Sequence, residues 1–236
     1  MMSVRVVLVE PRYEGNVGAV CRVMKNFGFS ELFLVKPCGL GDFAKAMSMH
    51  ARDVLESARI VDTFEEALEG VDIAIATTGK PGARLAGHVR HPYFNPKELR
   101  EMLEDKAGTA ALVFGREDRG LTNDTLERCD IVAYIPTSKE YPIMNLSQAV
   151  AIFMYELSGF KGGRVALASR ELMDVFYSHY EGLLDDIGYP EHKKGRTMTM
   201  LRRIYGRAML NEREYYTMMG VLHEIELALE RARKHG

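Results

Sequence analysis

Short apolar runs alternate with segments of helical periodicity over the first two thirds of the chain. Six runs, most of them rich in β-branched residues, lie at residues 4–9, 32–35, 58–61, 73–76, 110–114 and 131–135. Their nearly continuous hydrophobicity is typical of strands buried on both faces of a parallel sheet. Between them, apolar residues three and four positions apart predict helices at residues 16–27, 64–69, 96–105, 123–128 and 146–157. We therefore expect an α/β domain over residues 1–160, with a mostly parallel sheet and helices on both of its faces.

Residue types that favour helix ends mark two of these helices. Asn16 is the predicted N-cap of the first helix, and Gly28 is expected to end it. Thr63 and Glu66 have the spacing of a capping box. Both helix starts come shortly after a predicted strand, as an alternation of strands and helices requires.

A glycine-rich segment at residues 159–163 interrupts this pattern. Beyond it, residues 166–187, 196–209 and 212–234 have helical periodicity, and no strand is predicted. We expect a second, all-helical unit over residues 161–236. A unit of about 70 residues is below the size that folds comfortably alone, so it should pack on the first domain or on a second copy of itself.

Composition narrows the class of protein. The chain has 236 residues, of which 47% are apolar and 27% charged, as in ordinary folded proteins. No apolar run approaches the ~20 residues that span a bilayer, and no signal-peptide pattern precedes the first strand, so we expect a cytoplasmic protein without a membrane segment. Cys21, Cys38 and Cys129 form no C-x-x-C pair, which argues against a disulfide framework and against a metal site.

Charge is nearly balanced overall, at −2, but one stretch of the helical unit is basic throughout. Its cations are Lys193, Lys194, Arg196, Arg202, Arg203 and Arg207, with no acidic residue among them. Such a run is either a solvated helix face or a surface that binds the phosphates of a nucleic acid. Tyr205 lies within the run and could stack on a base or pack inside the helical unit.

A glycine pattern after the second strand leaves another chemistry open. Gly39, Gly41 and Ala44 follow the spacing of a dinucleotide-binding fingerprint, and Asp62 lies at the end of the third strand. The fingerprint normally follows the first strand of its unit, however, and an ordinary strand-to-helix loop would show the same glycines. A dinucleotide-dependent oxidoreductase is therefore kept as an alternative.

Three polar loops follow the carboxyl ends of predicted strands. Residues 10–18 lead into a helix on which Gly18 and Arg22 share a face, and Gly18 leaves room for a bulky group to approach. The other two loops are residues 114–120 and residues 135–147. Open parallel sheets bind their ligands at the edge formed by the carboxyl ends of their strands. We therefore predict that the three loops form one site.

The motifs in these loops resemble, in order, the three motifs of the SPOUT superfamily of RNA methyltransferases, most closely its tRNA/rRNA ribose 2′-O branch. They are Asn16-x-Gly18-x-x-x-Arg22, Leu112-Val-Phe-Gly115-x-Glu117-x-x-Gly120-Leu, and Ile135-Pro136 with Met144-Asn145-Leu-Ser147. Residues 199–208 are similar to the C-terminal signature of the TrmJ family, which methylates nucleotide 32 of the tRNA anticodon loop. The resemblance implies a trefoil knot in the first domain, bound S-adenosyl-L-methionine, a tRNA substrate and a homodimer with its sites at the knot interface.

The resemblance also implies roles for individual residues. Arg22 matches the arginine of the first motif, which is proposed as a general base; because a guanidinium stays protonated, orientation of the target phosphate is the alternative. Asn16 would hold the substrate or fix its loop, and Glu117 would orient Arg22 or a neighbouring cation. Asn145 and Ser147 would fix the cofactor loop and the ribose.

Backbone groups would form most of the cofactor site. The matching residues are Thr77, Thr78, Gly79, Gly115, Ile135, Ile143, Met144 and Asn145. Many members have Ser-Leu-Asn where this chain has Ile143-Met144-Asn145, so a contact made by that serine must be absent or supplied by another group. No metal is implied. The leading hypothesis is a tRNA ribose 2′-O-methyltransferase acting on cytidine or uridine at nucleotide 32, and a catalytically silent RNA-binding protein on the same scaffold is the alternative.

Overall fold

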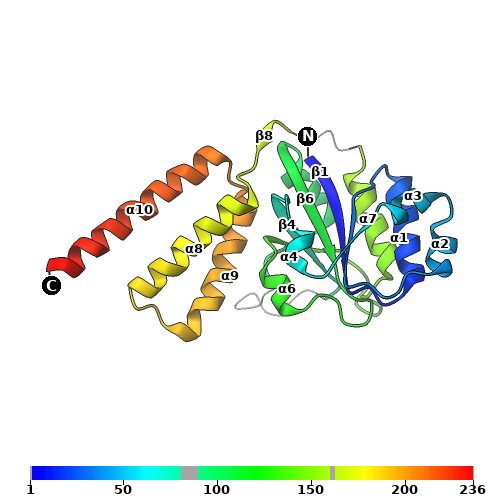
Figure 1. Cartoon of the computed structure of the whole chain (residues 1–236), viewed down its shortest axis with the longest axis horizontal. Helices are drawn as coiled ribbons and strands as arrows, with labels where there is room; N and C mark the ends of the chain where they lie inside the picture. The colour runs from blue at the N-terminus through cyan, green and yellow to red at the C-terminus, as the bar shows by residue number, and fades with distance from the viewer. Residues whose placement is uncertain (1, 81–89, 160–162, 236) are drawn as a thin grey trace.

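The computed structural model describes residues 2–80, 90–159 and 163–235, and it shows a sheet-containing body joined to a group of long helices (Figure 1). The boundary expected between residues 160 and 161 lies outside the described residues. Among the helices that the structure describes, none has the length and apolar character needed to cross a bilayer.

The strands form one parallel sheet. Their bounds are β1 (Met2–Val9), β2 (Leu32–Val35), β3 (Arg59–Val61), β4 (Ile73–Thr78), β5 (Tyr93–Phe94), β6 (Lys106–Phe114), β7 (Ile131–Tyr134) and β8 (Val165–Ala166). The order is β3-β2-β1-β6-β4-β7-β5, and β8 pairs with the start of β6. The six predicted strands are confirmed. β8 shows that the expectation of no strand beyond residue 163 is wrong, because a two-residue strand is too short to leave a hydrophobic pattern.

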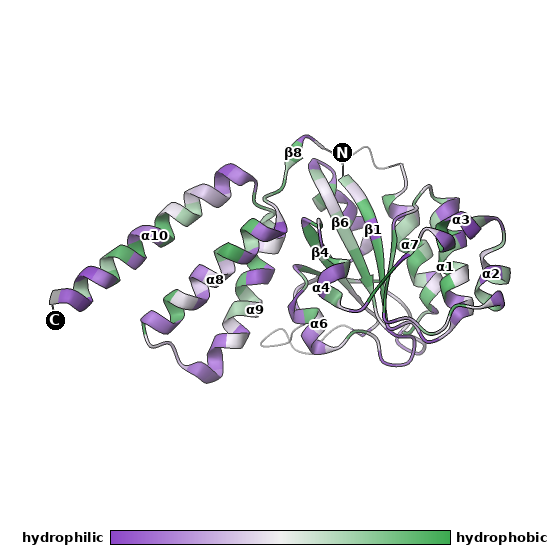
Figure 2. Cartoon of the chain, in the orientation of Figure 1, coloured by the Kyte–Doolittle hydropathy of each residue, from purple (hydrophilic) through white to green (hydrophobic). Residues whose placement is uncertain are grey.

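Helices cover both faces of the sheet, as predicted. One face carries α1 (Glu14–Asn26), α3 (Arg52–Glu56), α5 (Pro96–Leu103) and α7 (Leu146–Leu157). The opposite face carries α4 (Phe64–Ala67) and α6 (Asn123–Glu127). In β1, Val6 and Leu8 point into the first core while Val7 points into the second. Figure 2 shows these central strands as the most hydrophobic part of the body. The trefoil knot implied by the resemblance stays a prediction.

Helix α2 (Asp42–Ser48), the 3₁₀ helix η1 (Met49–Ala51) and α3 do not appear in the sequence prediction. Helix α2 packs closely on α1, where a Cβ atom at Gly18 would lie 2.3 Å from the Ala44 carbonyl oxygen. The bulky group that approaches Gly18 is therefore helix α2 of the same chain.

The predicted helix ends are partly confirmed. Gly28 has a positive φ of 80° just past the end of α1, and the Thr63 hydroxyl accepts a hydrogen bond from the Glu66 N–H at 3.2 Å. Helix α1 begins at Glu14 after Tyr13, however, so the prediction of Asn16 as its N-cap is wrong. Asn16 lies in the first turn of α1, and its side chain is free to make contacts elsewhere.

The C-terminal part consists of α8 (Arg170–Asp186), α9 (Glu191–Ala208) and α10 (Glu212–His235). Helix α8 packs against both of the others and forms a separate core with them, centred on Phe176. Figure 1 shows α9 beside the sheet-containing body and α10 extending away from it. This part of the chain packs on its own first domain, which was one of the two arrangements expected.

Candidate active site

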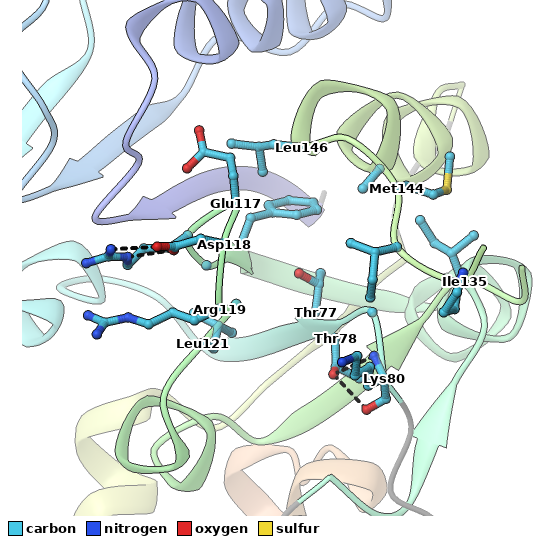
Figure 3. Close-up of a pocket in the computed structure, with 18 of the residues that line it drawn as sticks. Thr77, Thr78, Lys80, Glu117, Asp118, Arg119, Leu121, Ile135, Met144 and Leu146 are labelled. Carbon is cyan, nitrogen blue, oxygen red and sulfur yellow. Dashed lines mark hydrogen bonds and ion pairs between the residues drawn. The ribbon is translucent and has the colours of Figure 1, made fainter. Parts of the chain in front are cut away.

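The loops that follow β4, β6 and β7 surround a cavity of about 250 Å³ (Figure 3). Seven of the eight residues expected to bind the cofactor line it: Thr77, Thr78, Gly79, Gly115, Ile135, Ile143 and Met144. Its walls also include Phe114, Leu121, Thr137, Leu146 and Phe153, which sequence reasoning did not single out. Asn145 lies outside this cavity and lines a neighbouring one. Two of the three polar loops predicted to form one site, residues 114–120 and 135–147, line this cavity, whereas residues 10–18 do not.

The threonine hydroxyls at this cavity hold the loops rather than point at a ligand. Thr77 donates to the Val113 carbonyl at 2.9 Å, and Thr78 donates to the Lys80 carbonyl at 3.0 Å. Thr137 donates to the Pro142 carbonyl at 2.8 Å, next to Ile143, where the family resemblance led us to expect a serine. Thr137 is therefore the group that ties down the loop before Ile143.

Two glycines of the cavity lie at close contacts of the loops. A Cβ atom at Gly115 would lie 2.3 Å from the carbonyl carbon of Gly120 and from the nitrogen of Leu121. These are backbone atoms that cannot move aside, so any larger residue at 115 would push the loop after β6 open. At Gly79 a Cβ atom would lie 2.9 Å from the end of the Ile143 side chain, so the loops after β4 and β7 are in contact as well.

A chain of hydrogen bonds connects the three motifs. The Asn16 amide donates to Glu117 Oε1 at 2.9 Å, and the Asn145 amide donates to Asn16 Oδ1 at 3.2 Å. Asn145 Oδ1 in turn accepts from the backbone N–H of Ser147 at 2.9 Å and from its hydroxyl at 2.8 Å, which makes Asn145 the N-cap of α7. Four of the five residues expected to be catalytic are thus joined in one network.

Glu117 binds the start of α1. Its carboxylate accepts from the N–H groups of Arg12 at 2.9 Å and Tyr13 at 3.3 Å, besides Asn16. These contacts hold the N-terminal end of α1, where a negative charge is favourable. In the described part of the chain Arg22 is not among the partners of Glu117, and the expectation that Glu117 orients Arg22 or a neighbouring cation stays a prediction.

Arg22 lies apart from this network. It is exposed on α1 and lines neither of the cavities near the motifs. Within the residues that the structure describes, it has no hydrogen-bond or ion-pair partner. The prediction that Arg22, Glu117 and Asn145 close into one pocket is therefore not met within a single chain.

A second, more open cavity of about 810 Å³ lies on the other side of the loop after β7. It shares Glu117 and residues 142–144 and 146 with the first cavity, so the two have a common wall. Asn16, Asn145 and Ser147 line it, together with exposed Tyr13, Phe43 and Tyr141. The two cavities are therefore adjacent, and groups held in them would lie next to each other at these residues.

The charged loop after β6 is braced by ion pairs. Arg116 binds both oxygens of Asp118, at 3.0 and 2.9 Å, and also contacts Glu10 at 3.3 Å. Arg12 contacts Asp118 at 3.0 Å and Arg119 contacts Glu10 at 3.0 Å. The hydrogen bonds from Arg116 hold the pKa of the Asp118 carboxyl well below its usual range. The loop is thus held in one shape at neutral pH.

The basic run of α9 is only partly available to a nucleic acid. Arg203 is 2% exposed and donates to the carbonyls of Leu126 and Cys129. Arg202 binds Asp130 and Asp174, at 3.1 and 3.0 Å.

Lys194 is the third cation of this run, after Arg202 and Arg203, that is bound within the protein: it contacts Asp185 at 2.7 Å. The expectation that these three cations bind RNA phosphates is wrong, because their partners come from other segments and use their charge. Lys193 and Arg196 are exposed and Arg207 is half-buried, and in the described residues none of them has an ion-pair partner.

Tyr205 packs inside the helical unit. Its ring lies 4.7 Å from that of Phe176 at right angles, and its hydroxyl shares a hydrogen bond of 2.8 Å with that of Tyr180. Of the two roles considered for Tyr205, packing is the one that the structure supports.

The dinucleotide alternative fails on a local contact. The Glu14 carboxylate accepts from the N–H groups of Gly41 at 2.5 Å and Ala44 at 3.2 Å. A dinucleotide fingerprint needs such amides for a pyrophosphate, and here a carboxylate occupies them and would repel a phosphate. Asp62 is exposed, and its N–H donates to Glu66.

Comparison with known proteins agrees with the fold and the site. The SpoU rRNA Methylase family model matches residues 3–155, and the model of the tRNA methyltransferase TrmJ, C-terminal domain, matches residues 171–235. The fold and its loops are therefore those of a SPOUT-class methylase. The chain belongs to the TrmJ tRNA methyltransferases of this family.

The similarity extends over nearly the whole chain. The tRNA (cytidine-2′-O-)-methyltransferase TrmJ of Methanocaldococcus jannaschii is 37% identical over 93% of this chain and 98% of its own. The tRNA (cytidine/uridine/adenosine-2′-O-)-methyltransferase TrmJ of Pseudomonas aeruginosa is 36% identical over 94% of this chain and 93% of its own. Among solved structures, TrmJ from Z. mobilis has a TM-score of 0.75 at 28% identity, covering 94% of this chain and 98% of that one.

Proposed function

We propose that the protein transfers a methyl group from S-adenosyl-L-methionine to a ribose 2′-hydroxyl of tRNA, on cytidine or uridine at nucleotide 32. The full-length similarity to TrmJ proteins supports the reaction class. The observation that carries the proposal is the wall shared by the two cavities, formed by Glu117 and the loop after β7. A methyl donor in the first cavity and a ribose in the second would be neighbours at these residues, and transfer requires the methyl group to be open to the ribose there.

The residues of the first cavity fit S-adenosyl-L-methionine. Phe114, Leu121 and Ile135 provide apolar surface for an adenine ring. Because the hydroxyls of Thr77 and Thr78 are occupied within the loops, hydrogen bonds to the ligand would come from backbone groups near Gly79 and residues 135–144. When bound, the cofactor supplies a methyl group on a sulfonium, which already carries its leaving group.

The protein must then orient a weakly acidic hydroxyl and help its proton to leave. Much of such a rate enhancement comes from holding the reacting groups in line. Asn16, Asn145 and Ser147 line the second cavity and are fixed by their mutual hydrogen bonds. We assign them to ribose orientation, and Glu117 to holding the start of α1 in place.

Arg22 contributes to this reaction only in a dimer. It is exposed and lies outside the cavities of its own chain, so a second copy must bring it to the ribose. A guanidinium carries its proton at neutral pH and is a poor base, which favours a role in orienting the target phosphate. Exposed Tyr155 on α7, packed edge-on against Phe27 of α1, offers apolar surface for the contact between copies.

Binding of tRNA would use the cations of α9 that have no partner in the described chain, Lys193, Arg196 and Arg207. Phosphate contacts of this kind are sequence-independent and weaken with salt. A tRNA substrate would place the activity in the cytoplasm.

The proposal is tested by incubating the protein with S-adenosyl-L-methionine and unmodified tRNA, and mapping the modified nucleotide by mass spectrometry. A 2′-O-methylated pyrimidine at nucleotide 32 is expected. Arg22→Ala should bind the cofactor normally and lose most of the transfer. Absence of any methylated ribose with cofactor and tRNA both bound would support the silent RNA-binding alternative, and equal transfer by Arg22→Ala would refute the assignment of Arg22.

A further inference from the structure

We propose that Phe43 on α2 is a stacking platform for the base of the target nucleotide. The inference deepens the proposed function and rests on it. The base is attached to C1′ of the ribose, next to the C2′ that carries the reacting hydroxyl, so it must lie in the ribose cavity or at its mouth. Phe43 lines that cavity together with Asn16, Asn145 and Ser147.

Phe43 is exposed although it is held firmly from behind. Its side chain is 58% exposed, yet its ring rests against the backbone of α1, where a Cβ atom at Gly15 would lie 2.5 Å from the ring carbon Cε1. A glycine at position 15 therefore makes room for the ring. An aromatic side chain backed by a helix and open on its other side is suited to stacking on a base.

The start of α2 is fixed by a separate contact. Glu14, the residue before Gly15, accepts hydrogen bonds from the N–H groups of Gly41 and Ala44 on either side of Phe43. Both neighbouring residues of α1 thus position the same phenyl ring. This explains why a short helix is held so closely to α1 at a place where it adds little to the main core.

Two further aromatic residues flank the cavity. Tyr13 is 60% exposed and Tyr141 is 84% exposed, and both line it with Phe43. Exposed aromatic side chains gathered beside the polar groups that would hold a ribose indicate an RNA base as the occupant. Stacking tolerates any base, because every base has a π face. Phe43 would therefore strengthen binding of the target nucleotide without distinguishing cytidine from uridine.

The test compares Phe43→Leu, which keeps the apolar volume, with Phe43→Trp, which keeps the stacking surface. Loss of one base–aromatic stack should lower kcat/KM for tRNA about 5- to 100-fold in Phe43→Leu. Phe43→Trp should stay within about threefold of wild type. Cofactor affinity by calorimetry should be unchanged in both. Gly15→Ala, which displaces the ring without removing it, should resemble Phe43→Leu.

A direct readout is a tRNA carrying the fluorescent base pyrrolocytidine at the methylated position. Wild type and Phe43→Trp should quench it on binding, and Phe43→Leu should not. Equal quenching and equal kcat/KM in Phe43→Leu and wild type would overturn the proposal. The proposal would also be overturned if Phe43→Leu lowered both the activity and the molar mass measured by light scattering. The ring would then belong to a contact between two copies of the chain. A wild type that transfers no methyl would refute the proposed function, while the quenching would still decide the platform.

Discussion

The Glu117 carboxylate in the loop after β6 accepts a hydrogen bond of 2.9 Å from the side chain of Asn16, which lies 101 positions earlier in the chain. The same carboxylate holds the N–H groups just before α1. Two of the three motifs are therefore coupled through one side chain, and Asn145 joins the third to them. The structure of this network leads to specific predictions for its members.

Asn145 has two functions that substitutions can separate. Asn145→Ala removes both the cap of α7 and the bond to Asn16, and should lower the free energy of unfolding by about 0.5–2 kcal/mol. Asn145→Asp keeps the acceptor for Ser147 but has no N–H to donate to Asn16. It should keep most of the stability and lose about 10- to 100-fold in kcat, because the ribose is held less well. Urea unfolding and methyl-transfer kinetics measure the two effects, and full activity in Asn145→Asp would show that the bond to Asn16 does not matter.

The coupling between Glu117 and Asn16 is measurable in a double-mutant cycle. Glu117→Gln replaces an acceptor oxygen by an NH₂ group that faces other donors. Hydrogen bonds to a charged group contribute about 1.5–3 kcal/mol to the free energy of unfolding. Because this bond is partly exposed, Glu117→Gln should lower the unfolding free energy by an amount near the lower end of that range. Combined with Asn16→Ala, the two losses in unfolding free energy should be less than additive by at least about 0.5 kcal/mol. Additive losses would mean that the bond is not formed in solution.

Gly206 provides a test of how the helical unit is docked. A Cβ atom at this position would lie 2.4 Å from the carbonyl oxygen of Asp130, whereas Gly195 on the same helix has nothing within 4 Å. Gly206→Ala should destabilise the protein by about 1–3 kcal/mol and expose the segment before α8 to proteolysis. Gly195→Ala is the matched control and should be neutral or stabilising by up to about 1 kcal/mol. Similar melting curves for the two variants would contradict the close approach of α9 to β7.

The cations of α9 should divide into two groups. Arg196→Ala should weaken tRNA binding and reduce the slope of log affinity against log salt by about one, with an unchanged melting temperature. Arg202→Ala should instead lower the unfolding free energy by about 1–3 kcal/mol, because it removes a half-buried partner of Asp130. Filter binding over a salt series and thermal unfolding distinguish the two. A destabilised Arg196→Ala or a fully stable Arg202→Ala would reverse the assignment.

The thiols should respond to pH in a defined way. Burial raises the pKa of Cys21 and of Cys129 to about 12, from 9.0. A thiol whose pKa is higher in the folded state stabilises the fold below pH 9, and this contribution is lost as the pH rises from 9 towards 12. In native protein at pH 8 only Cys38 should react with a disulfide reagent, and slowly, because partial burial and the Glu117 and Glu14 carboxylates raise its pKa too. Rapid reaction of all the thiols before unfolding would contradict this.

The sheet could be predicted because its strands are buried on both faces, which gives continuous apolar runs such as residues 73–76. Helix α2 could not be predicted, since its seven residues are too few to show a helical period and it is stabilised by packing on Gly15 and Gly18, a contact that is not local. The convergence of the motif loops followed from the geometry of parallel strands. The hydrogen-bond partners within these loops could not be predicted, because a sequence does not show which of several polar groups a carboxylate such as Glu117 will contact.

Arg203 shows the same limit for charge. Among its neighbours in sequence it belongs to a basic run, but its partners are the carbonyls of Leu126 and Cys129, far away in the chain. Burial of its guanidinium lowers its pKa, so these carbonyl contacts are what allow a charged group to be buried there. No pattern of neighbouring residues carries that information.

The close contact between Gly206 and Asp130 fixes one end of α9 relative to the sheet. Helix α9 has 18 residues, and a rise of about 1.5 Å per residue places Lys193 about 20 Å from Gly206 along the helix axis. If RNA binds at Lys193, as proposed above, it would be held at a fixed distance from Asp130. One extra helical turn inserted before Arg202 would move Lys193 by about 5 Å along the axis, nearly the spacing between successive phosphates. A bound RNA would then present a different nucleotide to the active site.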